Sequence, residues 1–431
     1  MDMEYTPISK ILLKLSPPVM LSLLIQSIYN IVDSFFVARY SAEGLTALSL
    51  VYPVQLLMLA LATGTGAGLN ILISRLDGLG ETEKQSDYIR TGFILTLVHF
   101  ILFAVPLNLM ADRYFHTFSA NPLVCRQGIF YTHIVLAGSL GLFVESISTK
   151  ILQARGNMVI PMAAQITGSV VNVILDPLLI LGIAGFPKLG IAGAAIATVL
   201  GQWAAMFLTL ISVLKHYSFK GHFSISSARQ IYRNGLGSIA TQSLYTFYII
   251  GLNAILKQFT EDAVTVLGLY YKIQTFFFIP LFGFQQVLLP VISYNYGAGK
   301  TKRTQEALRF ASVLSCSIMA VATLIFILFP YTLLGVFSTD VSILSIGCYA
   351  FRVISVSFVP AGLTVATTSY LQGVAKIKES VFIIILRQVF LLVPVAWILH
   401  FFGLHAVWWT FPLSEITSAF LGVILVKRAA R

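Results

Sequence analysis

Charged residues are scarce in this chain. They make up 10% of its 431 residues, whereas apolar residues make up 57%, and a soluble domain would be roughly one quarter charged. This composition excludes an ordinary soluble globular protein. Cysteine is scarce as well, because Cys125, Cys316 and Cys348 are scattered without the spacing of a metal site or an obvious disulfide pair. We interpret these cysteines as small apolar residues of helices.

Catalytic and cofactor-binding patterns are also missing. The sequence has no Gly-x-Ser-x-Gly and no His-Glu-x-x-His, and its seven histidines show no metal-ligand spacing. Residues 297–301 look like the end of a phosphate-binding loop, but that pattern needs a glycine where this chain has Tyr294. We therefore expect no enzyme and no cofactor, and an ion gradient rather than ATP as the source of energy.

Long apolar runs take the place of charge. Each is about 20 residues long, enough to cross a hydrocarbon core of roughly 30 Å as a helix. Because helices satisfy their own backbone in lipid, the sequence predicts an all-α integral membrane protein with twelve transmembrane helices. The predicted spans are 12–37, 46–74, 91–111, 125–150, 160–183, 190–214, 235–257, 264–293, 309–331, 343–371, 380–401 and 404–426.

The net charge of +11 reflects topology rather than nucleic-acid binding. Most Lys and Arg residues fall in loops on the side of the N-terminus. The opposite loops hold only Arg39, Arg113, Arg126, Lys188 and Lys257. The positive-inside rule therefore predicts that both termini lie in the cytoplasm. The start of the chain, MDMEYTPISK, has no cationic region typical of a signal peptide, so we expect the first helix to direct insertion.

The chain contains an internal repeat. Residues 73–90 realign without a gap on residues 292–309, an offset of 219 residues, and Gly78-x-Gly80 falls on Gly297-x-Gly299. The longest internal polar segment lies at the midpoint, so we predict an N-lobe at 1–214, a cytoplasmic linker at 215–234 and a C-lobe at 235–431. Six helices return the chain to its starting side. We therefore expect two six-helix lobes related by a pseudo-two-fold axis along the membrane normal.

A glycine cluster at residues 64–68 could suggest a nucleotide site. It lies inside an apolar run, where small residues spaced four apart indicate close helix packing. We adopt that interpretation.

The repeat is asymmetric at two carboxylates. Asp33 and Asp176 lie within apolar runs of the first half and have no acidic counterpart in the second half. A carboxylate at the centre of a membrane helix costs about 2.5–3.5 kcal/mol on insertion scales, so such residues are functional candidates. This asymmetry indicates that the first half is specialised for an ion.

Polar residues accompany both carboxylates. Asp33 shares a helical face with Gln26, Tyr29 and Asn30. A polar stripe of this kind must face the bundle interior or a wet cavity.

Asp176 is accompanied by Asn172 and Gln165 on its own predicted helix. Pro177 cannot donate a backbone hydrogen bond and frees a carbonyl, and Thr198 of the next helix could add a hydroxyl. Such an oxygen-rich set suits Na⁺. The same carboxylates could bind a proton instead, and Glu145 of the fourth helix is a further intramembrane candidate.

Three segments resemble the multidrug and toxic compound extrusion (MATE) family, in its bacterial branch. They are PPVMLSLLIQSIYNIVDSFFVA near the start, NVILDPLLI in the fifth helix and PVISYNYGAGKTKR after the eighth. Their order, spacing and twelve-helix setting cover essentially the whole chain. The resemblance implies export of small cationic, often aromatic compounds in exchange for Na⁺ or H⁺.

The resemblance also implies site residues. Asp33, Asn172, Asp176 and Thr198 match the family's cation site, which would hold Na⁺ if the protein is Na⁺-coupled. Some relatives carry an acid in the second half as well. Here Ile249 and Val395 lie near the equivalent positions, and Glu415 is the only acid within a predicted helix of that half.

We therefore predict a cation-coupled antiporter in a bacterial inner membrane, a monomer surrounded by lipid and without nucleic-acid partners. One alternative is a flippase for lipid-linked sugars, which would need a basic cavity, for which Arg352 and Arg387 are candidates. A second alternative, a membrane receptor or scaffold, would need a sizeable ligand-facing domain that the short loops do not provide.

Overall fold

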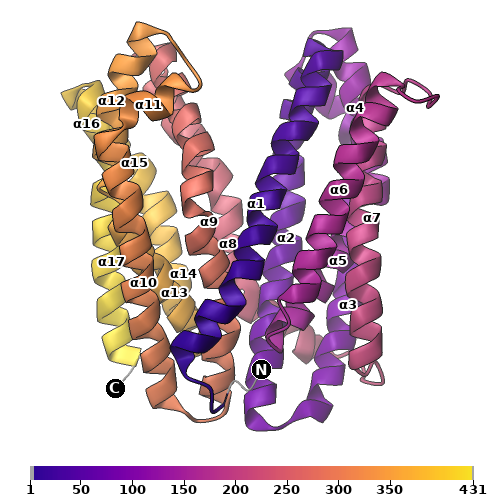
Figure 1. The fold of residues 1–431 in the computed structure, drawn as a ribbon, viewed down its shortest axis with the longest axis vertical. Helices are drawn as coiled ribbons and strands as arrows, with labels where there is room; N and C mark the ends of the chain where they lie inside the picture. The colour runs from indigo at the N-terminus through magenta and orange to yellow at the C-terminus, as the bar shows by residue number, and fades with distance from the viewer. Residues whose placement is uncertain (1–3, 430–431) are drawn as a thin grey trace. The chain divides into compact units, whose positions relative to one another are not determined.

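The computed structural model describes residues 4–429, except for the side chains at positions 42 and 246. The extreme ends of the predicted lobes, residues 1–3 and 430–431, lie outside it. Over the described residues the secondary structure is helical, without a β-strand (Figure 1). This confirms the all-α prediction.

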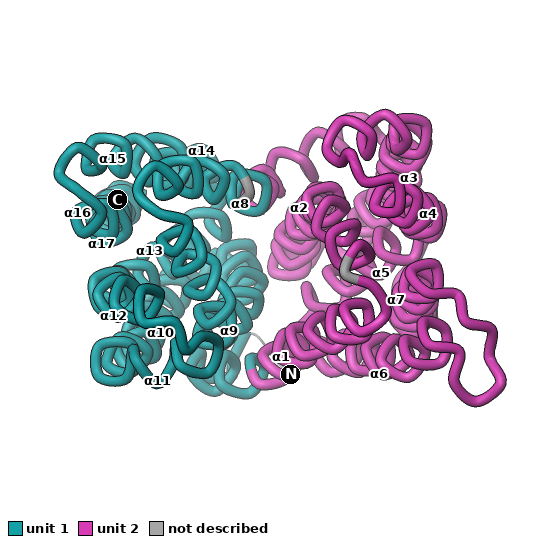
Figure 2. The backbone as a smooth tube through the Cα atoms, turned by 90° about the horizontal axis from the view of Figure 1, so that it is seen from above, with its two compact units in different colours: residues 1–16, 240–431 teal, residues 17–239 magenta. Residues whose placement is uncertain are grey.

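The chain divides into two compact units, coloured separately in Figure 2. The N-terminal unit consists of residues 17–239, and the C-terminal unit of residues 240–431 together with residues 1–16. Both boundaries fall within helices, α1 (Ile8–Tyr40) and α8 (Ile225–Leu256). The grouping thus differs from the predicted lobes at the N-terminus, since the first 16 residues belong with the second half.

The N-terminal unit contains most of α1 and the beginning of α8. Between them lie α2 (Ala42–Leu79), α3 (Thr82–Phe118), α4 (Pro122–Gly138), α5 (Leu140–Ala154), α6 (Val159–Leu181) and α7 (Ile191–His216). Within this unit α6 and α7 pack along each other, and α5 packs against both α2 and α7.

The C-terminal unit continues from the second part of α8. Its further elements are α9 (Glu261–Gly297), α10 (Thr301–Leu328), α11 (Pro330–Gly335), α12 (Val341–Ser355), α13 (Phe358–Gly373), α14 (Ile377–Ile385), a π-helical segment (Leu386–Leu391), α15 (Leu392–Leu399), a 3₁₀ turn (His400–Phe402), α16 (Leu404–Val407) and α17 (Thr410–Ala429). Its core is rich in aromatic side chains, including Tyr270, Phe326, Phe358 and Trp408.

Ten of the described helices are long and apolar enough to span a membrane, and two bent pairs bring the number to twelve. Each predicted span falls on one of these helices or pairs. The two bends, 45° between α4 and α5 and 43° between α12 and α13, were not predicted. At each bend a serine hydroxyl, from Ser139 or Ser357, donates to the carbonyl three residues earlier, at 2.8 and 2.6 Å. Such bonds compete with the helix ladder and bend it.

The repeat is visible in backbone geometry. Gly80 and Gly299, 219 positions apart, adopt left-handed φ values of +75° and +70°. The N–H of the residue after each glycine donates to the carbonyl five residues earlier, at 3.0 and 2.9 Å. Both turns are thus glycine-terminated helix ends of the same type, in agreement with the alignment of the repeat.

The glycine cluster of α2 packs against the beginning of α8. A Cβ at Gly68 would lie 2.0 Å from the carbonyl oxygen of Ile231, and a Cβ at Gly64 would lie 2.1 Å from Ile239 Cγ1. The close-packing interpretation is confirmed, because only glycine permits this approach of the two backbones.

Within the predicted linker at 215–234, residues 217–224 are non-helical. They are held against α3 of the N-terminal unit. Arg90 Nη1 donates to the Gly221 carbonyl at 2.9 Å, and the His222 N–H donates to Asp87 Oδ1 at 2.6 Å. The linker therefore packs against α3 of the N-terminal unit.

Candidate functional site

Two carboxylates meet within the N-terminal unit. Asp33 comes from α1 and Asp176 from α6, and their carboxylates lie close enough to interact electrostatically. Asp176 is fully buried, and Asp33 Oδ1 is buried without a hydrogen-bond partner. An unpartnered buried acceptor is costly, so this oxygen is suited to accept a cation or a proton.

Asn172 joins the pair from one helical turn before Asp176. Its amide lies 3.5 Å from both Asp176 Oδ1 and Thr198 Oγ1. In the orientation that satisfies both ends, its NH₂ donates to Asp176 Oδ2 at 3.2 Å, and its oxygen accepts from the Thr198 backbone N–H at 3.2 Å. The amide thus links α6 to α7 beside the carboxylate.

Proline shapes the backbone around Asp176. Pro177 lies inside α6 and has no N–H, so the carbonyl of Val173 lacks its helical donor. The four predicted residues Asp33, Asn172, Asp176 and Thr198 therefore gather where a carbonyl is also available.

Two tyrosines border the acid pair. Tyr29 lies within electrostatic range of Asp33, Asp176 and Glu145. Tyr131 of α4 lies close to Asp33 and Thr198, and its hydroxyl accepts from Gln55 Nε2 at 3.4 Å.

Neither Tyr131 nor Gln55 was among the site residues predicted from the sequence. The available signal was the pairing of Gln55 with Gln274 at the repeat offset. Tyr131 gave no such signal, because it stands in an unremarkable aromatic and β-branched stretch.

Glu145 lies on α5, and its carboxylate interacts with other side chains of the same helix. Thr149 Oγ1 donates to Glu145 Oε1 at 2.7 Å, and Lys150 lies within electrostatic range. Lys150 is on the same helix and donates to Gln153 Oε1 at 2.9 Å.

The other predicted cavity residues stand apart from the acid pair. Among the hydrogen bonds of the described residues, none joins the side chains of Gln26, Asn30 or Gln165 to Asp33 or Asp176. Asn30 is exposed, and Gln26 and Gln165 are half-buried.

The described residues contain no group of three or more His, Cys, Asp and Glu side chains that could hold a metal ion. Two carboxylates with amide, hydroxyl and carbonyl oxygens are instead a set that suits Na⁺ or a shared proton.

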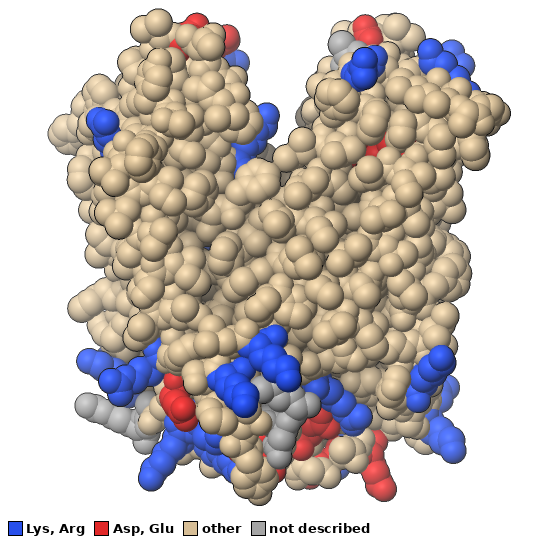
Figure 3. Space-filling view, in the orientation of Figure 1, with Lys and Arg blue, Asp and Glu red and all other residues tan. Residues whose placement is uncertain are grey.

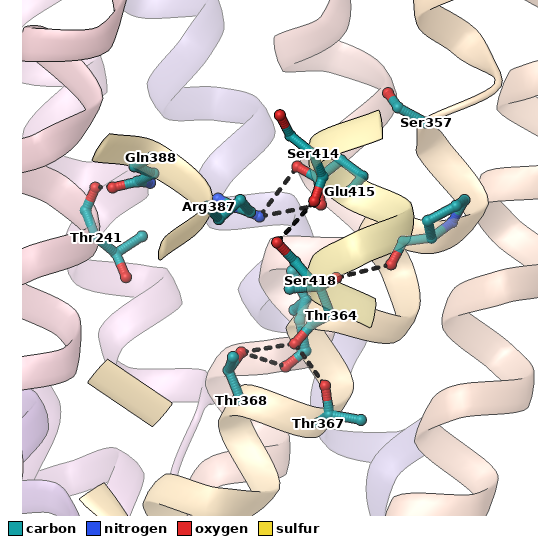
Figure 4. A network of polar contacts seen from close by, with 12 residues as sticks. Thr241, Ser357, Thr364, Thr367, Thr368, Arg387, Gln388, Ser414, Glu415 and Ser418 are labelled. Atoms are coloured by element: carbon teal, nitrogen blue, oxygen red, sulfur yellow. Dashed lines mark hydrogen bonds and ion pairs between the residues drawn. The ribbon is translucent and has the colours of Figure 1, made fainter. Parts of the chain in front are cut away.

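Among the described residues of the C-terminal unit, no second pair of buried acids corresponds to Asp33 and Asp176, but an oppositely charged pair is present. Arg387 and Glu415 meet there, surrounded by hydroxyl and amide groups (Figure 4). Lys272 and Arg352 are exposed, and Arg352 Nε reaches the Ile327 carbonyl at 3.4 Å.

A family model described as MatE matches residues 18–178 and 238–398 of the chain. The two segments are equally long and lie 220 residues apart, in agreement with the internal repeat.

Curated relatives cover almost the whole chain. A FAD transporter of Shewanella oneidensis is 27% identical over 404 residues, covering 90% of this chain and 88% of the relative. The multidrug export protein MepA of Staphylococcus aureus is 24% identical over 437 residues, covering 98% and 94%.

Solved structures share the fold. A MOP superfamily transporter from Pyrococcus furiosus, 23% identical, superposes with a TM-score of 0.91 and covers 99% of this chain and 96% of that one. A multidrug resistance MATE transporter in an outward-facing conformation, 24% identical, gives 0.90 with the same coverage. The family match spans well over half of the sequence, and the chain therefore belongs to the MATE family of multi-pass membrane transporters.

Proposed function

We propose that this protein is an antiporter that exports small organic cations in exchange for Na⁺ or H⁺. The observation that carries the proposal is the acid pair Asp33–Asp176 in a membrane-spanning unit, with one buried carboxylate oxygen that has no partner. Intramembrane carboxylates are costly and mark ion pathways. The multidrug export protein among the relatives supports drug export as the activity.

The coupling ion binds Asp33 and Asp176, with Asn172 and Thr198 as further oxygen donors. Entry of the ion from outside favours the state that has released the drug. Each charge that moves down 100 mV supplies about 2.3 kcal/mol. Drug and ion need not touch, since each only has to bind the two states with different affinity.

The substrate contacts in this proposal are Gln26, Tyr29, Asn30, Gln165 and Glu145. The open position of Asn30 and the proximity of Tyr29 to three carboxylates support contact with a cation. Aromatic rings and carboxylates together attract organic cations.

The proposed setting is the inner membrane of a bacterium, with both termini in the cytoplasm and the protein acting as a monomer. In each unit, Lys and Arg side chains gather at the end that carries the α2–α3 or the α9–α10 turn (Figure 3). The positive-inside rule places such ends in the cytoplasm.

Ethidium efflux from proteoliposomes under separately imposed Na⁺ and proton gradients tests the proposal. Efflux driven by one of these gradients, and lost in Asp33→Asn and Asp176→Asn, is the expected result. Full ion-dependent efflux in both variants would overturn it.

A second candidate substrate class is anionic. The FAD transporter among the relatives and the half-buried Arg387 favour it. A flavin dinucleotide and a lipid-linked sugar both belong to this class. Uptake of labelled FAD into inverted vesicles, and lipid flipping in the same vesicles, separate these substrates from ethidium.

A further inference from the structure

Arg387 and Glu415 form an unusually loose charged pair inside the C-terminal unit. Arg387 lies in the π-helical segment and Glu415 on α17. Both Glu415 oxygens approach the same nitrogen, Arg387 Nη1, at 3.3 and 3.5 Å. Charge-assisted bonds between nitrogen and carboxylate are usually about 2.7–2.9 Å long. Glu415 therefore occupies one corner of the guanidinium without a close bond.

Several polar atoms around this pair have no partner. Arg387 Nε, Ser414 Oγ and Gln388 Oε1 are buried and make no hydrogen bond within the described part of the chain. Figure 4 shows Arg387 between Gln388 on one side and Ser414 with Glu415 on the other. A guanidinium is a planar fork that binds two oxygens of one carboxylate or phosphate. The unpartnered Nε–H lies on the edge of the guanidinium away from Nη1, so Glu415 does not occupy that edge, and the Ser414 hydroxyl adds a second free donor.

The pair remains reachable and is placed by an irregular helix. The side chains of Arg387 and Glu415 keep 19% and 13% of their surface exposed. The π-helical turn precedes Pro394, which cannot donate to the Phe390 carbonyl, and such turns are frequent at functional sites. A buried ion pair stabilises a fold only when its geometry is excellent. The contacts of the Arg387–Glu415 pair are long, so this pair is better suited to release Glu415 and bind another anion.

We propose that Arg387 binds an oxyanion, the phosphate or carboxylate group of a transported solute, and that Glu415 is its internal competitor when the site is empty. The oxyanion binds the Nε–H of Arg387 and the Ser414 hydroxyl, and its negative charge competes with that of Glu415 for the guanidinium. Displaced Glu415 remains close to Thr364. This inference rests on the proposed transport function and assigns the residues that would bind its anionic substrate class.

The test compares riboflavin with FMN, two fluorescent probes that differ by one phosphate. Quenching of flavin fluorescence is titrated with the full-length protein in phosphatidylcholine nanodiscs. We expect the wild type to bind FMN at least ~10-fold more tightly than riboflavin, as a hydrogen-bonded charged group implies. Arg387→Lys keeps the charge and lacks Nε, so the preference should fall below ~3-fold. Glu415→Gln removes the competitor and should tighten FMN binding ~3-fold or more.

The Glu415→Gln arm excludes a purely structural role, because loss of a structural ion pair would not strengthen binding. Equal affinity for both flavins in the wild type, or weaker FMN binding in Glu415→Gln, would overturn the inference. Ethidium binding, measured in parallel, shows that each variant is folded. Absence of ion-driven ethidium transport in the wild type would instead contradict the proposed function alone.

The oxyanion could also be a lipid headgroup. Nanodiscs that contain phosphatidylglycerol distinguish the two sources. If this lipid weakens FMN binding to the wild type but not to Arg387→Lys, the headgroup phosphate occupies Arg387. If FMN binding is unchanged, the site takes its phosphate from the solute.

Discussion

The carboxylate of Asp33 on α1 lies close to the carboxylate of Asp176 on α6, although the Asp176 side chain is fully buried and Asp33 Oδ1 has no hydrogen-bond partner. Two carboxylates at this separation repel each other unless a proton or a cation lies between them. We therefore expect the binding and release of a proton or cation between these two carboxylates to control the transport cycle.

Replacing either acid with its amide should uncouple transport. We expect ion-dependent ethidium efflux in proteoliposomes to fall at least ~10-fold in Asp33→Asn and in Asp176→Asn, because the charge that attracts the ion is removed. Asp112→Asn, an exposed aspartate of α3, is the matched control and should behave like the wild type. Equal losses in the control would show that the effect is not specific to the pair.

Asn172 should matter more than the Thr198 hydroxyl. Its amide bonds the Asp176 carboxylate and the backbone N–H of Thr198, and a hydrogen bond to a charged group contributes about 1.5–3 kcal/mol. Asn172→Leu, which introduces the residue found at the repeat position Leu391, should weaken the apparent affinity for the coupling ion ~10-fold or more. Thr198→Val keeps the backbone contact and should have a smaller effect. The reverse order, measured from the ion dependence of efflux, would contradict this geometry.

Tyr131→Phe should have a modest effect on ion binding. The hydroxyl bonds Gln55 and reaches Thr198, and hydrogen bonds between membrane helices average about 0.6 kcal/mol. We expect the ion affinity to fall ~2–5-fold. Tyr114→Phe removes a hydroxyl that donates to the Leu50 carbonyl at 2.8 Å and should leave the ion dependence unchanged. If both variants respond alike, the Tyr131 effect is structural.

Gly68→Ala should destabilise the N-terminal unit by about 1–3 kcal/mol, as overpacking does. The added Cβ would lie 2.0 Å from the Ile231 carbonyl oxygen, whereas a Cβ at Gly268 of α9 meets nothing within 4 Å. Thermal unfolding in detergent should therefore show a lower Tm for Gly68→Ala and little change for Gly268→Ala. Similar Tm values for the two variants would argue against the close approach of α2 and α8.

The orientation can be tested with single cysteines in a cysteine-free background. Lys188→Cys lies in the exposed turn between α6 and α7, and Lys220→Cys lies in the segment between α7 and α8. A membrane-impermeant maleimide added to intact cells should label position 188 and leave position 220 unlabelled until the membrane is opened. The opposite pattern would place the termini outside.

The sequence by itself determined the number of spans, the duplication and the residues of the acid pair. These follow from local rules, because apolar length, turn-forming glycines and the cost of intramembrane charge are properties of short segments. The helix bends at Ser139 and Ser357 were not predicted, because a serine hydroxyl that bonds to its own helix leaves the apolar pattern of the sequence unchanged.

Only the tertiary structure decided which side chains meet. Tyr131 became a neighbour of Asp33 because α1 and α4 pack in one unit, and Arg387 acquired Glu415 as its partner because the last two spans pack against each other. Pairing between helices depends on their rotation and register, which the hydrophobic pattern of a lipid-embedded helix leaves largely undefined. The residue types of each candidate site could therefore be identified from the sequence, whereas the side chains that contact them depend on how the helices pack.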